Sequence, residues 1–179
     1  MVALTRISFV RAALAENRSI DAVVGEATMT VTNLARFERF FRRAAGLDID
    51  KGDLRRYEDF VHRKIYDLLL RGEANAKANG RDVLQPFDLP ITRGLQECIH
   101  AYRKINDEEG LQVDSILRAL AQLPQLDLVY GEETEAKLPE VAGGLSYALA
   151  RSFKDVYPDL KNPGYVHWET LFRLFDLLV

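Results

Sequence analysis

The segment from Asp50 to Asn79 constrains the fold of this chain more than any other, because it predicts one amphipathic helix of roughly eight turns. Apolar residues recur along it at steps of three or four, which places them on one face of the helix. These residues are Leu54, Tyr57, Val61, Ile65, Leu68 and Gly72. Asp50 is expected to cap the start of the helix, and Gly80 is expected to follow its end in the left-handed conformation. The chain is therefore predicted to be built around one continuous, mostly apolar stripe.

Shorter helices are predicted on either side of this long one. From Leu34 to Ala45, phenylalanines recur on one face and arginines line another, which indicates an amphipathic helix. A loop at 47–50 joins this helix to the long one. Pro86 is expected to open a third helix that runs through Ile105, because a proline has no need of its missing N–H at the first helical position.

The rest of the chain repeats this short, long, short plan after a charged linker at 106–110. Its helices are predicted from Asp114 to Leu123, from about Glu132 to Val156, and from His167 to Leu178. No strand-rich or low-complexity tract competes with an all-α assignment. The sequence thus predicts two halves, 31–106 and 111–179, that together form one compact unit. Residues 1–30 are interpreted either as a separate N-terminal appendage or as a consequence of an upstream start codon.

Composition limits the classes of function. The 179 residues have a formal net charge of -3, so the chain has no global attraction to phosphate and any nucleic-acid contact must be local. The single cysteine, Cys98, excludes an internal disulfide framework. No apolar run approaches the roughly 20 residues of a membrane helix, and charged residues interrupt the N-terminus where a signal peptide would be apolar. We expect a cytoplasmic protein without a membrane partner.

Four stretches of the sequence, at residues 37–48, 60–70, 79–82 and 167–169, carry the most specific resemblance to a known family. Through them the chain resembles, from about Leu34 to Val179, a bacterial histone-fold family of unknown function in which one chain holds two histone folds as a pseudo-dimer. The resemblance implies an all-α fold of two tandem histone folds that clasp each other in an intramolecular handshake. It also implies a structural ion pair between Arg81 and Asp88. The second half departs from this pattern, since Trp168 stands where the matching aspartate is expected after Lys161.

The resemblance implies that the handshake brings the first loop of each half beside the second loop of the other. One end of the molecule would then gather cations able to hold a DNA backbone. The predicted contact residues are Arg36, Arg39, Arg42, Arg43, Lys51 and Lys161. The opposite end would place Arg81 near Asp127, Glu132, Glu133 and Glu135, which should repel phosphate. We therefore expect weak, one-sided, sequence-nonspecific binding of double-stranded DNA.

Other hypotheses stay open beside this one. Arg36, Arg39, Arg42 and Arg43 could form a solvated face that is paired with Glu38 and its neighbours. The chain could instead be a protein-interaction or self-associating module, for which the aromatic residues Trp168, Phe172 and Phe175 would be docking side chains rather than core. An enzyme is the weakest hypothesis, because His62, His100 and His167 are scattered and Cys98 is interpreted as a small core residue. We expect no cofactor, no metal and no small-molecule substrate.

Overall fold

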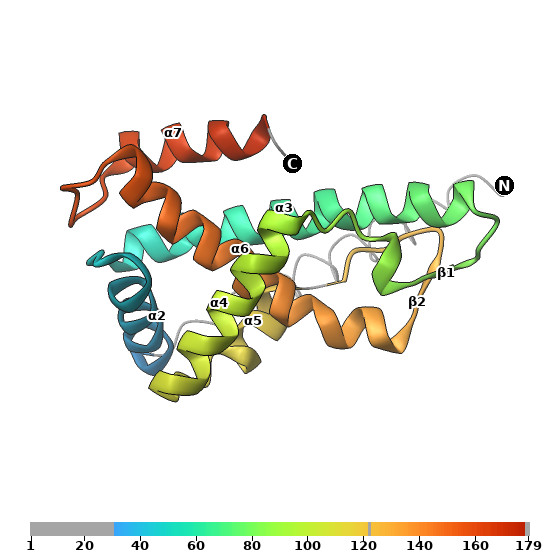
Figure 1. The fold of residues 1–179 in the computed structure, drawn as a ribbon, viewed down its shortest axis with the longest axis horizontal. Coiled ribbons are helices and arrows are strands. Elements are labelled where there is room, and N and C mark those ends of the chain that lie inside the picture. Colours follow the sequence, from blue (N-terminus) through green and yellow to red (C-terminus); the bar gives the residue numbers. More distant parts are fainter. Residues whose placement is uncertain (1–30, 122, 178–179) are drawn as a thin grey trace, which may run out of the picture.

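The computed structural model describes residues 31–121 and 123–177, so the expected N-terminal appendage lies outside the described residues (Figure 1). These residues are mostly helical, with a small two-stranded sheet. The elements in chain order are α2 (Val31–Ala45), α3 (Lys51–Ala78), β1 (Val83–Leu84), a 3-10 turn η1 (Pro86–Asp88), α4 (Arg93–Glu109), α5 (Asp114–Leu120), β2 (Val129–Tyr130), α6 (Glu132–Val156) and α7 (Tyr165–Asp176). Among the described helices, none is both long and apolar enough to cross a membrane.

The long helix α3 forms as the sequence predicts, and both of its ends are fixed by the expected residues. The carboxylate of Asp50 accepts the N–H of Asp53 at 2.8 Å, and the carboxylate of Asp53 accepts the N–H of Asp50 at 3.2 Å. This reciprocal pair satisfies backbone donors that the first turn leaves open. Gly80 follows the helix with φ +67°, where a side chain would be strained. The apolar stripe is buried along most of the helix.

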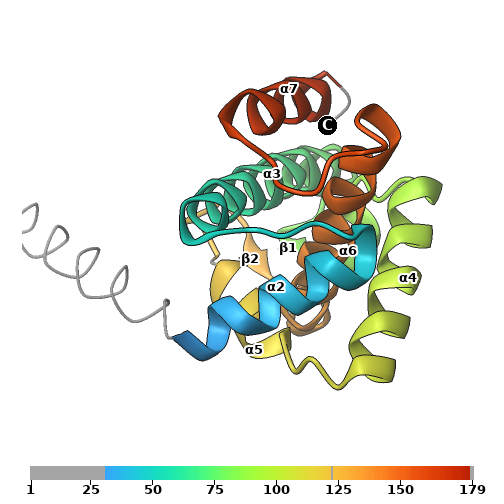
Figure 2. The same cartoon turned by 90° about the vertical axis from the view of Figure 1, so that its left-hand side faces the viewer.

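Helices α3 and α6 cross in the middle of the molecule, as both views show (Figures 1 and 2). At the crossing the hydroxyl groups of Tyr57 and Ser146 lie 2.7 Å apart and are buried. Ser146 donates its own hydrogen to the carbonyl of Ala142 at 2.6 Å, so Tyr57 is the donor to Ser146. Burial raises the pKa of Tyr57, which keeps the phenol protonated. The two halves of the chain therefore share one core.

Two adjacent glycines let α4 lie very close to α6. A Cβ atom added to Gly143 would overlap the ring of Tyr102. A Cβ atom added to Gly144 would lie 3.1 Å from the backbone nitrogen of Ile99 and 3.2 Å from its Cα atom, and would overlap its side chain. This glycine pair therefore permits the close approach of the two helices. Because α4 belongs to the first half and α6 to the second, the contact also joins the two halves.

The loops of the two halves pair crosswise at both ends of the crossed helices. At one end β1 and β2 lie parallel, with Val83 opposite Val129 and Leu84 opposite Tyr130. At the other end the N–H of Asp48 donates to the carbonyl of Lys161 at 2.8 Å. The loop after α2 thus lies beside the loop after α6, and the loop after α3 lies beside the loop after α5.

The third helix departs from its predicted bounds at both ends. Pro86 opens only the short turn η1, and Leu89 before Pro90 is extended, since a residue before proline avoids the helical region. Helix α4 begins at Arg93, where the hydroxyl of Thr92 caps it by accepting the N–H of Leu95 at 3.2 Å. The predicted linker is also wrong, because α4 runs through 106–109 and stops only at Gly110, whose φ is +56°.

The helices of the second half differ less from their predicted bounds. Helix α6 has the predicted bounds, whereas α5 ends at Leu120 rather than Leu123. Helix α7 spans Tyr165–Asp176 and so begins two residues before His167. The imidazole of His167 accepts the N–H of Gly164 at 2.9 Å, which satisfies a donor of the first turn and lets the helix begin earlier. The short strand β2 was not predicted, because its two residues are extended through pairing with β1, which is distant in the sequence.

Trp168 and Phe172 belong to the core rather than to a docking surface, and Phe175 is partly buried against the same core. The indole of Trp168 packs edge-on against Phe153, with ring centroids 4.8 Å apart. Its Nε1–H donates to the carboxylate of Asp53 at 2.7 Å, and both groups are buried. Burial raises the pKa of Asp53. This bond ties α7 of the second half to the first turn of α3.

The close approach of α4 and α6 predicts that Gly144→Ala destabilises the protein. Overpacking at a contact formed partly by backbone should lower the free energy of unfolding by about 1–3 kcal/mol or more, measured by urea denaturation. The matched control is Gly94→Ala, because the added Cβ atom would have no neighbour nearer than 4.0 Å. That substitution should leave stability equal or raise it slightly. Equal stability of the two variants would contradict the tight contact.

Candidate nucleic-acid interface

The end of the molecule formed by residues 46–51 and 157–164 is called the paired-loop end, and Figure 2 faces it. The hydrogen bond from Asp48 to Lys161 joins its two segments. The ammonium of Lys154, in the last turn of α6, donates to the carbonyls of Pro158 at 2.9 Å and Leu160 at 3.0 Å. These bonds satisfy two backbone carbonyls of the loop after α6. The backbone of both loops is thereby held in place.

The structure brings three of the predicted contact residues together at the paired-loop end. Lys51 opens α3 and Lys161 lies in the loop after α6; both are exposed, and neither forms an ion pair with another described residue. Arg42 is also exposed, but its Nε and Nη2 atoms donate to Asp48 at 3.0 and 2.8 Å. The two lysines are therefore free to contact a phosphate. Arg42 can contact one only with the guanidinium N–H groups that do not bind Asp48.

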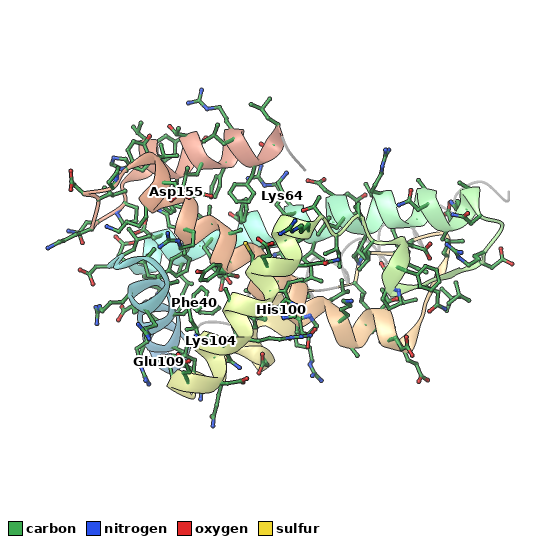
Figure 3. The ribbon with its side chains drawn as sticks, viewed as in Figure 1. Phe40, Lys64, His100, Lys104, Glu109 and Asp155 are labelled. Carbon is green, nitrogen blue, oxygen red and sulfur yellow. The ribbon has the colours of Figure 1, made fainter. Side chains whose placement is uncertain are left out.

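The other three predicted arginines lie along α2 and turn toward the end of α4. Arg43 forms ion pairs with Glu109 at 3.0 Å and Glu108 at 3.8 Å. Arg39 lies 3.7 Å from the Glu109 carboxylate and donates to its backbone carbonyl at 3.3 Å. Arg36 donates to the carbonyl of Gln112 at 3.2 Å. Figure 3 shows Glu109 at the end of α4, beside α2. These contacts give the arginines a role in holding α2 to α4. The carboxylates that pair with Arg39 and Arg43 come from α4, whereas the paired-face hypothesis expected Glu38 and its neighbours on α2.

Sequence reasoning missed two cations from α6. Arg151 and Lys154 line a shallow hollow of about 430 Å³ together with Arg43 and Gly46, and Asp155 adds one carboxylate. The signal in the sequence was that Arg151 and Lys154 lie three residues apart, on one face of the predicted helix. What the sequence could not show was that the crossing of α3 and α6 places this face next to the loop after α2.

The opposite end, around β1 and β2, carries the acidic residues that the sequence placed there. The ammonium of Lys77 lies 2.8 Å from Asp127 and 2.9 Å from Glu73, which raises the pKa of Lys77. The same contact lowers the pKa of Asp127, so both partners stay charged at neutral pH. The side chains of Glu132, Glu133 and Glu135 are all exposed. This end should repel phosphate.

Arg81 and Asp88 form the ion pair that the resemblance implied. The carboxylate of Asp88 is buried and also accepts the N–H of Gln85 at 2.9 Å. The guanidinium of Arg81 lies 4.8 Å from the centroid of the Phe87 ring. The pair therefore fastens the loop after α3 to η1, and this cation serves the fold rather than a ligand.

The histidines and the cysteine lie in separate environments. Burial lowers the pKa of His62, and its buried Nε2 atom has no hydrogen-bond partner among the described residues. Cys98 is half-buried rather than part of the core, and burial raises the pKa of its thiol. Within the described ranges, no group of three or more His, Cys, Asp and Glu side chains could hold a metal ion.

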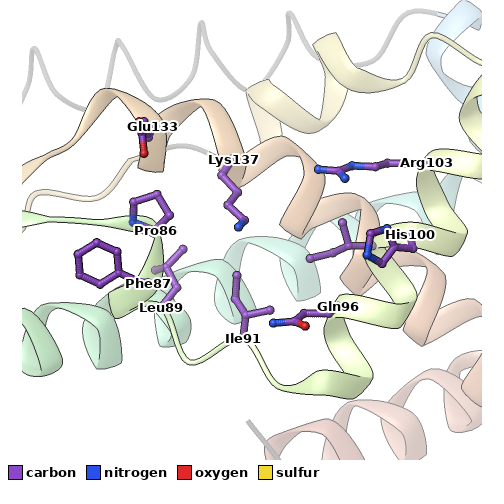
Figure 4. A pocket seen from close by; sticks show the side chains of 10 residues that line it. Pro86, Phe87, Leu89, Ile91, Gln96, His100, Arg103, Glu133 and Lys137 are labelled. Atoms are coloured by element: carbon purple, nitrogen blue, oxygen red, sulfur yellow. The ribbon is translucent and has the colours of Figure 1, made fainter.

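His100 lines a hollow of about 530 Å³ between η1, α4 and α6, shown in Figure 4. Lys137 from α6 points into it from one side, and Gln96 from α4 lies on the other. Arg103 at its edge forms an ion pair with Glu140. The hollow adds a mixed polar and apolar surface to the side of the molecule, away from the paired-loop end.

A substitution tests the structural role of Arg81. Arg81→Ala should lower the free energy of unfolding by about 1–3 kcal/mol, because it leaves the buried Asp88 carboxylate without its cation while solvent reaches part of the site. The matched control is Arg93→Ala, which breaks an exposed pair with Glu97 and should leave thermal stability unchanged. A loss as large in the control as in Arg81→Ala would argue against a special role for the loop pair.

Comparisons with known proteins place the chain among uncharacterized relatives. Residues 37–176 match a family model described as a domain of unknown function, DUF1931. An uncharacterized protein of Aquifex aeolicus (strain VF5) is 32% identical over 139 residues, which cover 72% of this chain and 81% of that protein. A crystal structure from Thermus thermophilus is 49% identical, with a TM-score of 0.72, and covers 82% of this chain and 97% of that chain. A crystal structure from Aquifex aeolicus is 24% identical, with a TM-score of 0.73 over 82% of this chain and 95% of that chain, and shows a shared fold alone.

Proposed function

The chain belongs to the DUF1931 family of unknown function, and from that premise we propose that it is a non-catalytic histone-fold pseudo-dimer that contacts double-stranded DNA weakly and without sequence preference. The histone-fold part of the proposal is supported by the repeated order of a short, a long and a short helix. It is supported further by the crossing of α3 with α6 and by the crosswise pairing of the loops at both ends.

The observation that most favours the DNA contact is the bond between the N–H of Asp48 and the carbonyl of Lys161. It holds the exposed cations Lys51 and Lys161 at one end of the molecule, although they are far apart in the sequence. Arg55 lies one turn after Lys51 and is expected on the same face of α3. Positive side chains held on fixed backbone segments are suited to binding phosphates in register along a duplex.

The proposed DNA contact uses fewer of the six residues that the sequence predicted, so the binding is expected to be weak. Arg36, Arg39 and Arg43 already bind acceptors at the end of α4 or in the loop that follows it. We therefore assign the contact to Arg42, Lys51 and Lys161, with Arg151 beside them. About four phosphate contacts would give a salt slope of roughly -3.6, which is far shallower than that of a strong DNA-binding protein. The acidic opposite end makes the binding one-sided.

A second candidate function is a protein-interaction module that has lost nucleic-acid binding. The observation that favours it is the pairing of the α2 arginines with Glu108 and Glu109, because these cations are neutralised within the protein. A DNA-retardation experiment at low salt separates the two functions. A wild-type protein that leaves duplex DNA unretarded would favour the interaction module.

The DNA contact predicts the behaviour of the double variant Lys51→Glu and Lys161→Glu. Both residues are exposed and lack ion pairs with described residues, so stability should be unchanged. The affinity for a random-sequence duplex at low salt should fall about tenfold or more, and the salt slope should drop from roughly -3.6 to roughly -1.8. Charge reversal at Arg43 is a poorer test, because it would place a third carboxylate beside Glu108 and Glu109.

The matched control is the double variant Arg93→Glu and Arg118→Glu, which changes the net charge by the same amount on α4 and α5, away from the paired-loop end. DNA affinity should then fall only by the small amount expected from the change in net charge. Equal losses in both double variants would mean that the paired-loop end is not the contact surface.

A further inference from the structure

An apolar groove of about 1,090 Å³ lies between α3, α4, α6 and the end of α7. Its apolar wall includes Leu68, Leu95, Leu145 and Phe175. Leu70, which lines the groove, is 41% exposed. Two further leucines flank the lining residues Phe175 and Asp176 in the sequence: Leu174 is 40% exposed and Leu177 is 81% exposed. A concave apolar surface with exposed leucines near it is a candidate interaction site.

An ion-pair cluster around the buried Lys64 lines one side of the groove. Lys64 is 2% exposed, and its ammonium lies 2.8 Å from Asp176 and 3.0 Å from Asp67. Figure 3 shows Lys64 between α3 and α7. Because Asp176 is the last residue of α7, this contact fixes the end of α7 to the middle of α3. The contact fixes this wall of the groove, which reduces the ordering that binding would require.

We infer that this groove is the two-fold interface between two copies of the chain, in which each copy inserts Leu174 and Leu177 into the groove of the other. A two-fold interface uses the same patch on both partners, so the patch must hold both a protrusion and a matching hollow. Here the end of α7 is the protrusion, and the groove beside it is the hollow. The inference rests on this patch alone and does not depend on DNA binding.

The charges around the groove also fit a second copy. Arg71 lines the groove, is exposed, and forms no ion pair with another described residue. The carboxylates of Asp67 and Asp176 line it too and remain about half exposed. A two-fold axis through the patch places Arg71 of one copy opposite the carboxylates of the other and the reverse. A partner with charges of one sign would instead meet a like charge at part of this rim.

Sedimentation velocity over a range of protein concentrations tests the inference. The wild-type chain should form a dimer as the concentration rises, and Leu177→Asp should weaken that dimer about tenfold or more. The matched control is Val166→Asp, which places the same charge on another mostly exposed apolar residue at the other end of α7 and should dimerise as the wild type does. Both variants should keep the wild-type melting temperature, because both residues are mostly exposed.

The single cysteine gives an independent measurement, because Cys98 lines the groove. Its rate of reaction with a maleimide should fall as the wild-type concentration rises, and it should be independent of concentration in Leu177→Asp. A wild-type chain that sediments as a monomer at several hundred micromolar would overturn the inference. A dimer that leaves the reactivity of Cys98 unchanged, or that forms equally well with Leu177→Asp, would overturn it as well.

Discussion

The contact between α3 and the second half of the chain is the interaction on which the rest of the structure depends. The apolar stripe of α3 is too long to be covered by α2 alone, and the core becomes complete only when α6 crosses it. Tyr57 and Ser146 place a satisfied polar contact at this crossing, while the glycine pair of α6 admits α4 from the first half. Each half therefore completes the apolar core of the other, and linking them in one chain avoids the entropy that two separate chains lose on association.

This crossing also determines what lies at each end of the molecule. Because the loops pair crosswise, one end collects Lys51, Lys161 and the last turn of α6, whereas the other collects the acidic first turn of α6 and the loop before it. The net charge of the chain is small, so it is the separation of basic and acidic residues between the two ends that would direct phosphate to the paired-loop end. The arginines of α2 cluster in the sequence, but three of them bind acceptors on the α4–α5 side and are therefore not free to contact phosphate.

Much of the fold could be predicted from the sequence, because helical periodicity and capping residues are local signals. The positions of α3 and α6 followed from such signals, whereas the pairing of Arg81 with Asp88 followed from the family resemblance. The start of α4 was missed because Pro86 and Thr92 are both acceptable helix starts, and Pro90 between them decides in favour of Thr92.

The candidate site was predicted less well. The exposure of Lys51 follows from local position, but the use of Glu109 by two arginines depends on tertiary contacts that no local pattern contains.

The mutual dependence of the two halves is tested most directly by cutting the chain at their connection and measuring folding. Fragments 31–112 and 113–179 would be produced separately, and their thermal unfolding would be followed by circular dichroism, alone and mixed in equal amounts. If α3 needs α6 to bury its apolar stripe, neither fragment alone should unfold cooperatively, and the mixture should recover a single transition with the fluorescence of a buried Trp168. A cooperative transition in either fragment alone would contradict a core that the two halves share.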